Sequence, residues 1–465
     1  MYKPIDRHDL DFLTGLLGGD RVMIKLPDGY NRDEMPIYGE GNGEIAVSVL
    51  NVNEVSAILK YADAHHIAVT TRGSGTGLVG ACVPLHGGII LSTAKMNRIL
   101  SIDPTTMSAV VEPGVLLMKL AAAAEDLKVM YPPDPGEKSA TIGGNAATNA
   151  GGMRAIKYGV TRDYVKALEV VLANGEILNL GKDVSKNSSG YALKDLMIGS
   201  EGTLGIITKL TLKLIPKPTL NVSLLVPFDD IRSALKAVPE IVQLPDVCTT
   251  LEFMEKEVLD DAKEYLGKDF PDRHHPAYLI LTYSASSQIQ LDAMVEQASV
   301  LLKSLDAKDI FLSDTVERQA ALWNTRGAFL EAIKSSTTLM DEADVVMPIT
   351  RIADYLDFIK TLSKKHQVRI RTFGHAGDGN LHVYVCKDAL DDQRWSSIVT
   401  TVMDALYERA IQENGAVSGE HGIGHAKKEY LKTSVGKTQI ALMRNIKAVF
   451  DPNGILNPDK IIDIK

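Results

Sequence analysis

Two glycine-rich motifs in the last hundred residues combine the residue types that hold catalytic metals. They are GHAGDGNLHV over 374–383 and SGEHGIG over 418–424. Two imidazoles and one carboxylate are the usual ligands of a catalytic divalent ion that keeps open positions for water or substrate. A single histidine is more often a hydrogen-bonded structural residue, but His375, His382 and Glu420 together favour a metal site.

The expected backbone decides which of these side chains can share a site. Strand alternation over 381–386 puts His382 on the opposite face from the apolar residues beside it, which face the core. Glu420 and His421 are adjacent in the chain, so both can serve one site only where the backbone bends. The glycines on either side of them permit that bend.

A third motif, RGSGTGLVG over 72–80, follows an expected strand. Gly75, Gly77 and Gly80 match the dinucleotide fingerprint G-x-G-x-x-G, which requires a helix to begin there. Pro84 and further glycines follow the motif, and no helix can run through them. A Rossmann site is therefore excluded. The residues leave two interpretations, a backbone nest whose N–H groups hold a phosphate and a plain glycine-rich turn.

The motifs that follow point to a flavin site by resemblance. RGSGTGLVG, YPPDPGEKSATIGGNAATNAGG, KYGVTRD and SEGTLGIIT occur in this order. The order resembles the FAD-binding domain of the vanillyl-alcohol oxidase superfamily. The resemblance implies that FAD contacts Arg72, Gly73, Ser74, Gly75, Thr76, Gly77, Pro132, Gly143, Gly144, Asn145, Gly151, Tyr158, Gly159, Glu201 and Ile206. Thr76 stands where covalently flavinylated members carry a histidine, so FAD should be bound non-covalently.

GHAGDGNLH followed by SGEHGIG resembles the C-terminal half of FAD-linked 2-hydroxy-acid dehydrogenases. This group includes D-lactate dehydrogenases, the flavin subunit of glycolate oxidase and D-2-hydroxyglutarate dehydrogenase. The resemblance implies that His375, His382 and Glu420 bind a divalent metal, which could be Fe²⁺, Zn²⁺ or Mn²⁺. It further implies that His421 is the catalytic base and that Arg326 clamps the substrate carboxylate.

The segment DEADVVMP over 341–348 bears on the substrate. Family members that oxidise 2-hydroxyglutarate carry a lysine for the distal carboxylate on this strand, and Glu342 stands at that place. An acid there would repel a dicarboxylate, so a small D-2-hydroxy acid is expected, with D-lactate oxidised to pyruvate. Glycolate and D-2-hydroxyglutarate are the alternatives.

The elements expected around these motifs form α+β domains. Residues 1–217, with a core over 40–217, are expected to form a vanillyl-alcohol oxidase-type FAD-binding domain of two α+β subdomains. Residues 218–413 should form a ferredoxin-like α+β substrate or cap domain with a largely antiparallel sheet. Residues 414–465 should pack back on the FAD domain and complete the active site. Segment 131–163 shows no period, and a long ordered loop is usually functional.

Composition narrows the class of protein. The 465 residues carry a net charge of −9, which argues against nucleic acid or an anionic membrane as the main partner. Three cysteines, far apart, exclude a disulfide scaffold, a four-cysteine zinc site and an iron–sulfur cluster held within this chain. No apolar run approaches the ~20 residues of a spanning helix. A cytoplasmic enzyme is expected.

The acceptor of the electrons is not encoded in a motif. Without iron–sulfur ligands, reduced FAD must pass electrons to oxygen, a quinone or a protein, and the resemblance suggests an electron-transferring flavoprotein. Two rival functions remain open. A metal-dependent hydrolase would use the His/Glu cluster and be colourless. A catalytically silent flavin-binding subunit usually loses the metal and base residues that are present here.

Overall fold

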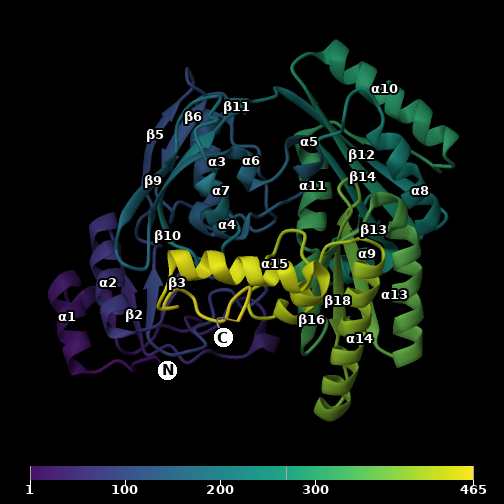
Figure 1. Ribbon diagram of the computed structural model, residues 1–465. Helices are drawn as coiled ribbons and strands as arrows, with labels where there is room; N and C mark the ends of the chain where they lie inside the picture. The colour runs from purple at the N-terminus through teal and green to yellow at the C-terminus, as the bar shows by residue number, and fades with distance from the viewer. Residues whose placement is uncertain (1, 269, 464–465) are drawn as a thin grey trace. The chain divides into compact units, whose positions relative to one another are not determined.

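The computed structural model describes residues 2–268 and 270–463. Contacts within the chain divide it into two compact units. Unit 1 comprises Met1–Gly151, Val160–Lys217 and Glu420–Lys465, and unit 2 comprises Gly152–Gly159 and Pro218–Gly419. Both units mix helices with sheets (Figure 1). Among the described residues, no helix is long and apolar enough to cross a bilayer.

Two short segments belong to a different unit from the one expected from domain boundaries at 217 and 413. Helix α5 (Ala155–Tyr158) contacts strand β13 (Thr250–Glu255), and residues 152–159 accordingly group with unit 2. Residues 414–419 also group with unit 2, because Ala416 forms a bridge to the end of a unit 2 strand. Neither grouping is visible in the local sequence, since both depend on contacts with distant strands.

Unit 1 contains two main sheets. The first has the order β1-β2-β4-β3, with β4 parallel to both β2 and β3, and the second is the antiparallel sheet β5-β6-β10-β8-β9. A further two-stranded sheet joins β7 and β11. The strands are β1 (Val22–Met23), β2 (Ile45–Ser48), β3 (Val69–Arg72), β4 (Ile89–Ser92), β5 (Ile99–Asp103), β6 (Ser108–Val111), β7 (Val129–Met130), β8 (Val165–Val171), β9 (Ile177–Gly181), β10 (Ile206–Lys213) and β11 (Ile215–Pro216).

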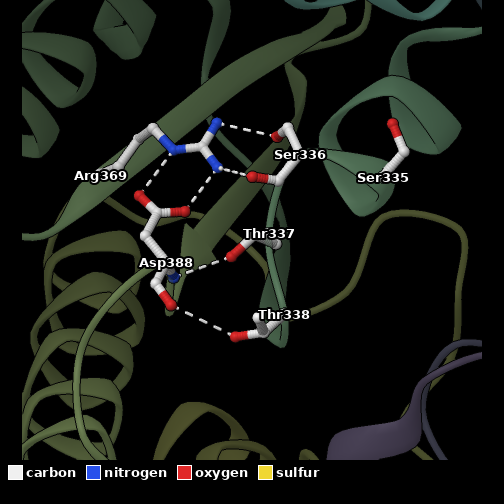
Figure 2. A pocket seen from close by; sticks show the side chains of 6 residues that line it. All are labelled: Ser335, Ser336, Thr337, Thr338, Arg369 and Asp388. Carbon is white, nitrogen blue, oxygen red and sulfur yellow. Dashed lines mark hydrogen bonds and ion pairs between the residues drawn. The ribbon is translucent and has the colours of Figure 1, made fainter.

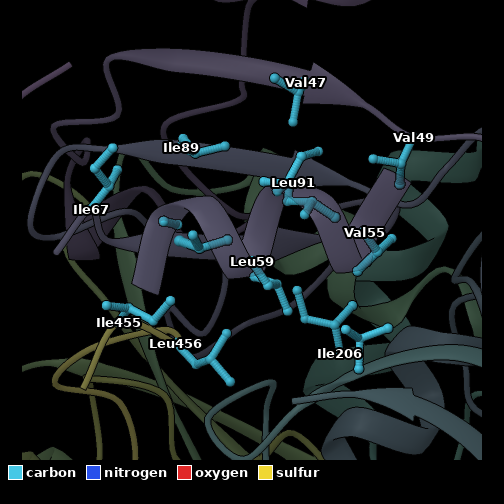
Figure 3. Close-up of a cluster of buried hydrophobic side chains, with 14 of the residues drawn as sticks. Val47, Val49, Val55, Leu59, Ile67, Ile89, Leu91, Ile206, Ile455 and Leu456 are labelled. Carbon is cyan, nitrogen blue, oxygen red and sulfur yellow. The ribbon is translucent and has the colours of Figure 1, made fainter. Parts of the chain in front are cut away.

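Helix α2 (Val52–His65) buries one apolar face in the core of unit 1. Helical spacing puts Val55 and Leu59 on the same side, and both are fully buried. Ile206 of β10 and Leu456 of the last segment complete the same cluster (Figure 3). The other helices of the unit are α1 (Arg7–Leu17), α3 (Leu117–Asp126), α4 (Ile142–Thr148), α6 (Thr161–Tyr164), α7 (Leu193–Met197) and α15 (Lys428–Phe450), with 3₁₀ turns η1 (Gly19–Arg21) and η2 (Pro36–Tyr38).

Unit 2 is built on a seven-stranded sheet with the order β15-β12-β14-β13-β17-β18-β16, in which every neighbouring pair is antiparallel. The expected antiparallel sheet is confirmed. Besides β13, its strands are β12 (Leu220–Phe228), β14 (Ala277–Ala285), β15 (Phe311–Ser313), β16 (Met340–Val346), β17 (Arg369–His375) and β18 (Asn380–Cys386).

Four helices of unit 2 pack against one side of this sheet. Helices α8 (Ile231–Val242), α10 (Gln288–Ser304), α13 (Ile352–His366) and α14 (Asp392–Gln412) contact the strands and lie along one side of the sheet (Figure 1). Two consecutive helices, α11 and α12, follow β15 in the chain. The remaining elements are α9 (Lys256–Leu266), α11 (Val316–Gly327), α12 (Phe329–Ser335) and η3 (Ile349–Arg351).

Candidate active site

One face of the unit 2 sheet collects buried polar side chains from four adjacent strands. Directly opposed residues of antiparallel strands point to the same face. His382 of β18 is opposite Asp344 of β16, and His375 of β17 is opposite Glu252 of β13. Phe373 of β17 is opposite His382 and therefore joins the two pairs. The strand pairing thus delivers both imidazoles and two carboxylates to one face.

The two imidazoles face each other through their outer nitrogens. Nε2 of His375 and Nε2 of His382 lie 3.4 Å apart. Nδ1 of His375 lies 2.6 Å from Oε1 of Glu252, and Nδ1 of His382 lies 3.3 Å from Oε1 of Glu342. Glu252 accepts the Nδ1 proton of His375, which leaves the lone pair of that ring on Nε2, and a proton on Nδ1 of His382 beside Glu342 would do the same for the second ring. Two lone pairs at this distance repel unless a proton or a cation lies between them.

This geometry fits a divalent metal ion. Two nitrogens bound to one tetrahedral ion at ~2.0–2.1 Å lie about 3.3–3.4 Å apart, which matches the observed separation. The rings are nearly perpendicular, with an angle of 89° between their planes. His375 and His382 can therefore act as two ligands of one ion, with the carboxylates behind them fixing the orientation of both rings.

Glu252 has a second partner in Arg326. Nε and Nη2 of Arg326 lie 2.9 Å and 2.5 Å from Oε2 of Glu252. The guanidinium also lies over the ring of Phe373, 4.6 Å from its centroid. Burial would raise the pKa of Glu252, but the charges of His375 and Arg326 outweigh burial, and the pKa lies below its ordinary value. One fully buried carboxylate thus joins a candidate metal ligand to the candidate substrate clamp.

Glu342 is buried beside one of the two candidate metal-binding histidines. It is 1% exposed and faces Nδ1 of His382. Tyr384 of β18 is directly opposite Glu342 and buried, and burial together with this carboxylate raises the pKa of the phenol well above its ordinary value. The carboxylate of Glu342 therefore has an imidazole and a phenol as partners.

The SGEHGIG motif begins on the same face of unit 2. Oδ2 of Asp344 accepts hydrogen bonds from the hydroxyl of Ser418 at 2.9 Å and from the amide of Gly419 at 3.0 Å. Oδ1 of Asp344 accepts a hydrogen bond of 2.7 Å from Nδ2 of Asn380. A Cβ at Gly419 would approach that nitrogen to 2.4 Å, so only glycine fits. Unit 2 ends at this anchor.

The next residues, Glu420 and His421, begin the last segment of unit 1. Oε1 of Glu420 lies 3.6 Å from Nε2 of His421. The other oxygen of Glu420 packs on Gly151, where an added Cβ would meet it at 3.1 Å. Gly151 is one of the expected flavin contacts, so the motif and the flavin segment are neighbours within unit 1.

A buried carboxylate holds the backbone of this loop. The amides of Ile423 and Gly424 donate to the two carboxylate oxygens of Glu201, each at 2.7 Å. Gly424 adopts a φ of 53°, and an added Cβ would lie 1.9 Å from the carbonyl oxygen of Val79. Burial raises the pKa of Glu201 to about 7, although both amides and Lys460 act to lower it. The carboxylate of this expected flavin residue is therefore engaged by the loop.

The glycine turn after β3 is packed tightly against its neighbours. Gly75 has a φ of 80°, and an added Cβ would lie 1.9 Å from Nη2 of Arg72. An added Cβ at Gly73 would lie 2.3 Å from the hydroxyl of Thr141. The turn therefore passes directly beside a guanidinium, whose positive charge suits an anionic group such as a pyrophosphate.

Comparison with protein families decides the class of protein. Residues 44–181 match the family described as FAD binding domain, and residues 217–461 match FAD linked oxidases, C-terminal domain. The chain belongs to the FAD-linked oxidases. FAD is accordingly the cofactor of unit 1, as the sequence motifs predicted.

Curated relatives of this FAD-linked oxidase are similar along nearly their whole length. A D-lactate dehydrogenase of Anaerostipes hadrus is 46% identical, with 95% of this chain and 94% of the relative covered. A glycolate oxidase subunit of Bacillus subtilis is 37% identical, with 93% and 91% covered. A D-2-hydroxyglutarate dehydrogenase of Stutzerimonas stutzeri is 35% identical, with 88% and 89% covered. The expected relationship to FAD-linked dehydrogenases of this group is confirmed.

Solved structures confirm the fold. A p-cresol methylhydroxylase with bound substrate superimposes with a TM-score of 0.80 over 100% of this chain and 99% of that chain, at 20% identity. A 4-ethylphenol oxidase of Gulosibacter chungangensis gives a TM-score of 0.78 at 18% identity, with 99% and 98% covered. These proteins have the vanillyl-alcohol oxidase-type architecture expected from the motifs.

Buried polar atoms in unit 1 of this FAD-linked oxidase fit a bound nucleotide. Nδ2 of Asn145 and the hydroxyl of Thr71 are buried and make no hydrogen bond to the described residues. Polar atoms this deep ordinarily have a partner. Together with the glycine turn at 73–77, they provide donors and space for FAD.

The expected flavin residues do not all contribute in the same way. Ile206 is 1% exposed, and its side chain lies in the hydrophobic core (Figure 3), so a flavin contact there must come from its backbone. Tyr158 and Gly159 group with unit 2. The others lie in unit 1: Arg72, Gly73, Ser74, Gly75, Thr76, Gly77, Pro132, Gly143, Gly144, Asn145, Gly151 and Glu201.

A hollow of about 500 Å³ in unit 2 is not part of this site (Figure 2). Its charged groups, Arg369 and Asp388, are paired through two hydrogen bonds, and Arg369 also donates to the hydroxyl and carbonyl of Ser336. Arg369 begins β17, whereas His375 ends it. The polar groups of the hollow serve to join two loops.

Proposed function

We propose that this FAD-linked oxidase oxidises a small D-2-hydroxy acid, with D-lactate converted to pyruvate. The observation that carries the proposal is the pair His375 and His382, whose Nε2 atoms lie 3.4 Å apart while carboxylates hold both Nδ1 atoms. A pair of this kind suits a metal that binds and polarises a substrate hydroxyl. The identity of 46% to a D-lactate dehydrogenase supports D-lactate as the first substrate to test.

We propose Glu420 as the third metal ligand on the basis of chain connectivity. Asp344 is directly opposite His382 and anchors the amide of Gly419. Glu420 is the next residue, so the covalent chain tethers its carboxylate within one residue of the anchor. Fe²⁺, Zn²⁺ and Mn²⁺ all accept two imidazoles and a carboxylate.

The remaining roles belong to two side chains. In this proposal Arg326 holds the substrate carboxylate and fixes its orientation. His421 removes the proton of the substrate hydroxyl, a task suited to an imidazole near neutral pH. When bound, FAD accepts the hydride from the substrate carbon, and the metal lowers the pKa of the hydroxyl.

Electrons then leave the flavin for a protein acceptor, which we propose to be an electron-transferring flavoprotein in the cytoplasm. Alternative substrates are glycolate and D-2-hydroxyglutarate, which relatives of similar coverage are named for. The expected repulsion of a dicarboxylate by Glu342 stays a prediction, which the burial of Glu342 beside His382 does not test. The preference for D-lactate therefore rests on sequence similarity.

The direct experiment is anaerobic bleaching of the flavin by a panel of D- and L-2-hydroxy acids. We expect D-lactate and D-2-hydroxybutyrate to bleach the flavin faster than D-2-hydroxyglutarate, and the L-enantiomers to leave it oxidised. A colourless protein would instead favour the metal-dependent hydrolase. Faster bleaching by D-2-hydroxyglutarate or glycolate would reassign the substrate.

We also propose that FAD is held without a covalent bond, because Thr76 cannot form the bond that a histidine forms in covalently flavinylated relatives. Precipitation of the protein with acid should release the yellow chromophore into the supernatant. Flavin that stays in the pellet would contradict this part of the proposal.

A further inference from the structure

Glu252 contacts two residues with different roles in the proposed function, a metal ligand and the arginine that holds the substrate carboxylate. Its Oε1 lies 2.6 Å from Nδ1 of His375, and its Oε2 lies 2.9 Å and 2.5 Å from two nitrogens of Arg326. The side chain is fully buried, so water does not compete for either oxygen. We propose that Glu252 is a positioning residue that couples the metal ligand His375 to the substrate clamp Arg326. This inference rests on the proposed function.

The first half of the coupling concerns the metal. By accepting the Nδ1 proton of His375, Glu252 keeps the lone pair of that ring on Nε2, which faces His382. Without the carboxylate, the ring can exchange its proton between the two nitrogens and turn. Outer carboxylates of this kind typically change metal affinity by about 10–100-fold.

The second half concerns Arg326. Arg326 is 7% exposed and stacks on Phe373, so its charge is held in an apolar environment. Glu252 engages Nε and Nη2, and this fixes the plane of the guanidinium. With its plane fixed, the guanidinium presents its remaining N–H groups in one orientation, and a planar substrate carboxylate can pair with them.

Glu342 provides a matched control, because it faces the other histidine. Its Oε1 lies 3.3 Å from Nδ1 of His382. Each imidazole thus has a carboxylate near Nδ1, and Glu252 is the one that the structure shows bonded to Arg326 as well. A comparison of the two variants separates an effect on the metal from an effect on the clamp.

The experiment compares Glu252→Gln and Glu342→Gln in the FAD-loaded full chain. Metal affinity is measured by titrating the chelator-treated protein with Zn²⁺ or Mn²⁺, and the KM is measured with the 2-hydroxy acid that bleaches the flavin best. A glutamine at 252 presents one donor and one acceptor, so it cannot satisfy both partners. We expect Glu252→Gln to weaken metal binding by about 10–100-fold and also to raise the KM. Glu342→Gln should weaken metal binding only.

Glu252→Asp keeps the buried charge but is one methylene shorter and cannot reach both partners. It repeats the test if Glu252→Gln fails to fold, and we expect the same two losses. FAD content and thermal unfolding verify the fold of each variant. The inference is overturned if metal affinity and KM stay unchanged, or if only one of the two changes. If the parent protein oxidises no 2-hydroxy acid, the proposed function fails, and an unchanged metal affinity would separately overturn the coupling.

Discussion

Two buried carboxylates, Glu252 in unit 2 and Glu201 in unit 1, hold the candidate site by different means. Glu252 is paired with the side chains of His375 and Arg326 across a sheet. Glu201 accepts two backbone amides from the SGEHGIG loop. The pKa of Glu252 is lowered, whereas burial raises the pKa of Glu201 to about 7. The charges of His375 and Arg326 outweigh burial at Glu252, whereas two amides together with Lys460 do not outweigh it at Glu201.

The difference follows from the local backbone. Strands present side chains at fixed positions, so unit 2 can place an acid against two bases with no unusual dihedral angles. The loop after His421 contains Gly422 and Gly424, both with positive φ, and offers its amides in place of side chains. An anchor of this kind fixes a backbone path and leaves the loop side chains available for chemistry.

The largest effect on activity is expected when His382 on its strand or His421 on its loop is replaced by alanine, and the two variants should differ in metal content. His382→Ala should lose metal and activity together, with partial recovery in excess Zn²⁺ or Mn²⁺, because a ligand is missing. His421→Ala should keep metal and FAD but slow hydride transfer by about 10²–10⁴, the usual contribution of a positioned base. Stopped-flow flavin reduction by D-lactate and metal analysis measure both quantities.

The opposite assignment would be visible in the same experiment. Loss of metal in His421→Ala with retention in His382→Ala would exchange the two roles. If chelation of the parent protein leaves the rate of flavin reduction unchanged, the metal is not catalytic, and His421 and Arg326 act without it.

The next effect is on stability and compares removal of each carboxylate. Glu252→Ala leaves Arg326 buried without its partner, and breaking such a pair costs about 3–5 kcal/mol. Glu201→Ala leaves two amides without an acceptor but also removes a costly buried acid, so we expect about 1–3 kcal/mol. A larger loss from Glu201→Ala would contradict the contrast between charged and dipolar partners.

The chain offers a separate probe for each unit in this measurement. Both tryptophans, Trp323 and Trp395, lie in unit 2, so tryptophan fluorescence during urea unfolding reports on unit 2. Release of FAD, read by flavin fluorescence, reports on unit 1. We expect Glu252→Ala to shift mainly the tryptophan transition and Glu201→Ala mainly the flavin transition.

The sequence predicted the parts of the site that are local. Expected strands over 367–373 and 381–386 correspond to β17 (Arg369–His375) and β18 (Asn380–Cys386). Alternation then placed His382 on the polar face. The glycine turn after β3 was also predictable, because glycine spacing and the following proline determine what the backbone can do.

The parts that depend on distant contacts could not be predicted. Glu252 lies 123 residues before His375, and its only local signal is an acid within the apolar strand TLEFME. Helix α15 was missed because Gly436, with a φ of 79°, interrupts its pattern. The contact of Glu342 with His382 could not be predicted for the same reason, since register across β16 and β18 decides that it faces an imidazole.

The smallest expected effect is a pH dependence of the stability of unit 1, and it has a definite sign. The pKa of Glu201 rises from its ordinary value of 4.5 to about 7 on folding. The folded state therefore holds a proton that the unfolded state releases, so this contribution is fully present below pH 4.5 and is lost as the pH rises to about 7. Its size is about 3 kcal/mol. The lowered pKa of Glu252 acts in the opposite direction, and its contribution is lost only as the pH falls below the ordinary range of a glutamate.

The measurement is the urea midpoint of FAD release at intervals from pH 5 to pH 8. Asp33 of unit 1, whose pKa burial raises to about 6, contributes with the same sign, so the parent slope alone does not isolate Glu201. Glu201→Gln cannot titrate and should flatten the slope, whereas replacement of the exposed Glu176 by glutamine should leave the slope as it is in the parent. An identical slope in the parent and Glu201→Gln would mean that the two loop amides hold Glu201 ionised across this range. Backbone dipoles would then stabilise a buried carboxylate as effectively as the charged partners of Glu252 do, and the contrast between the two units would lie in geometry alone.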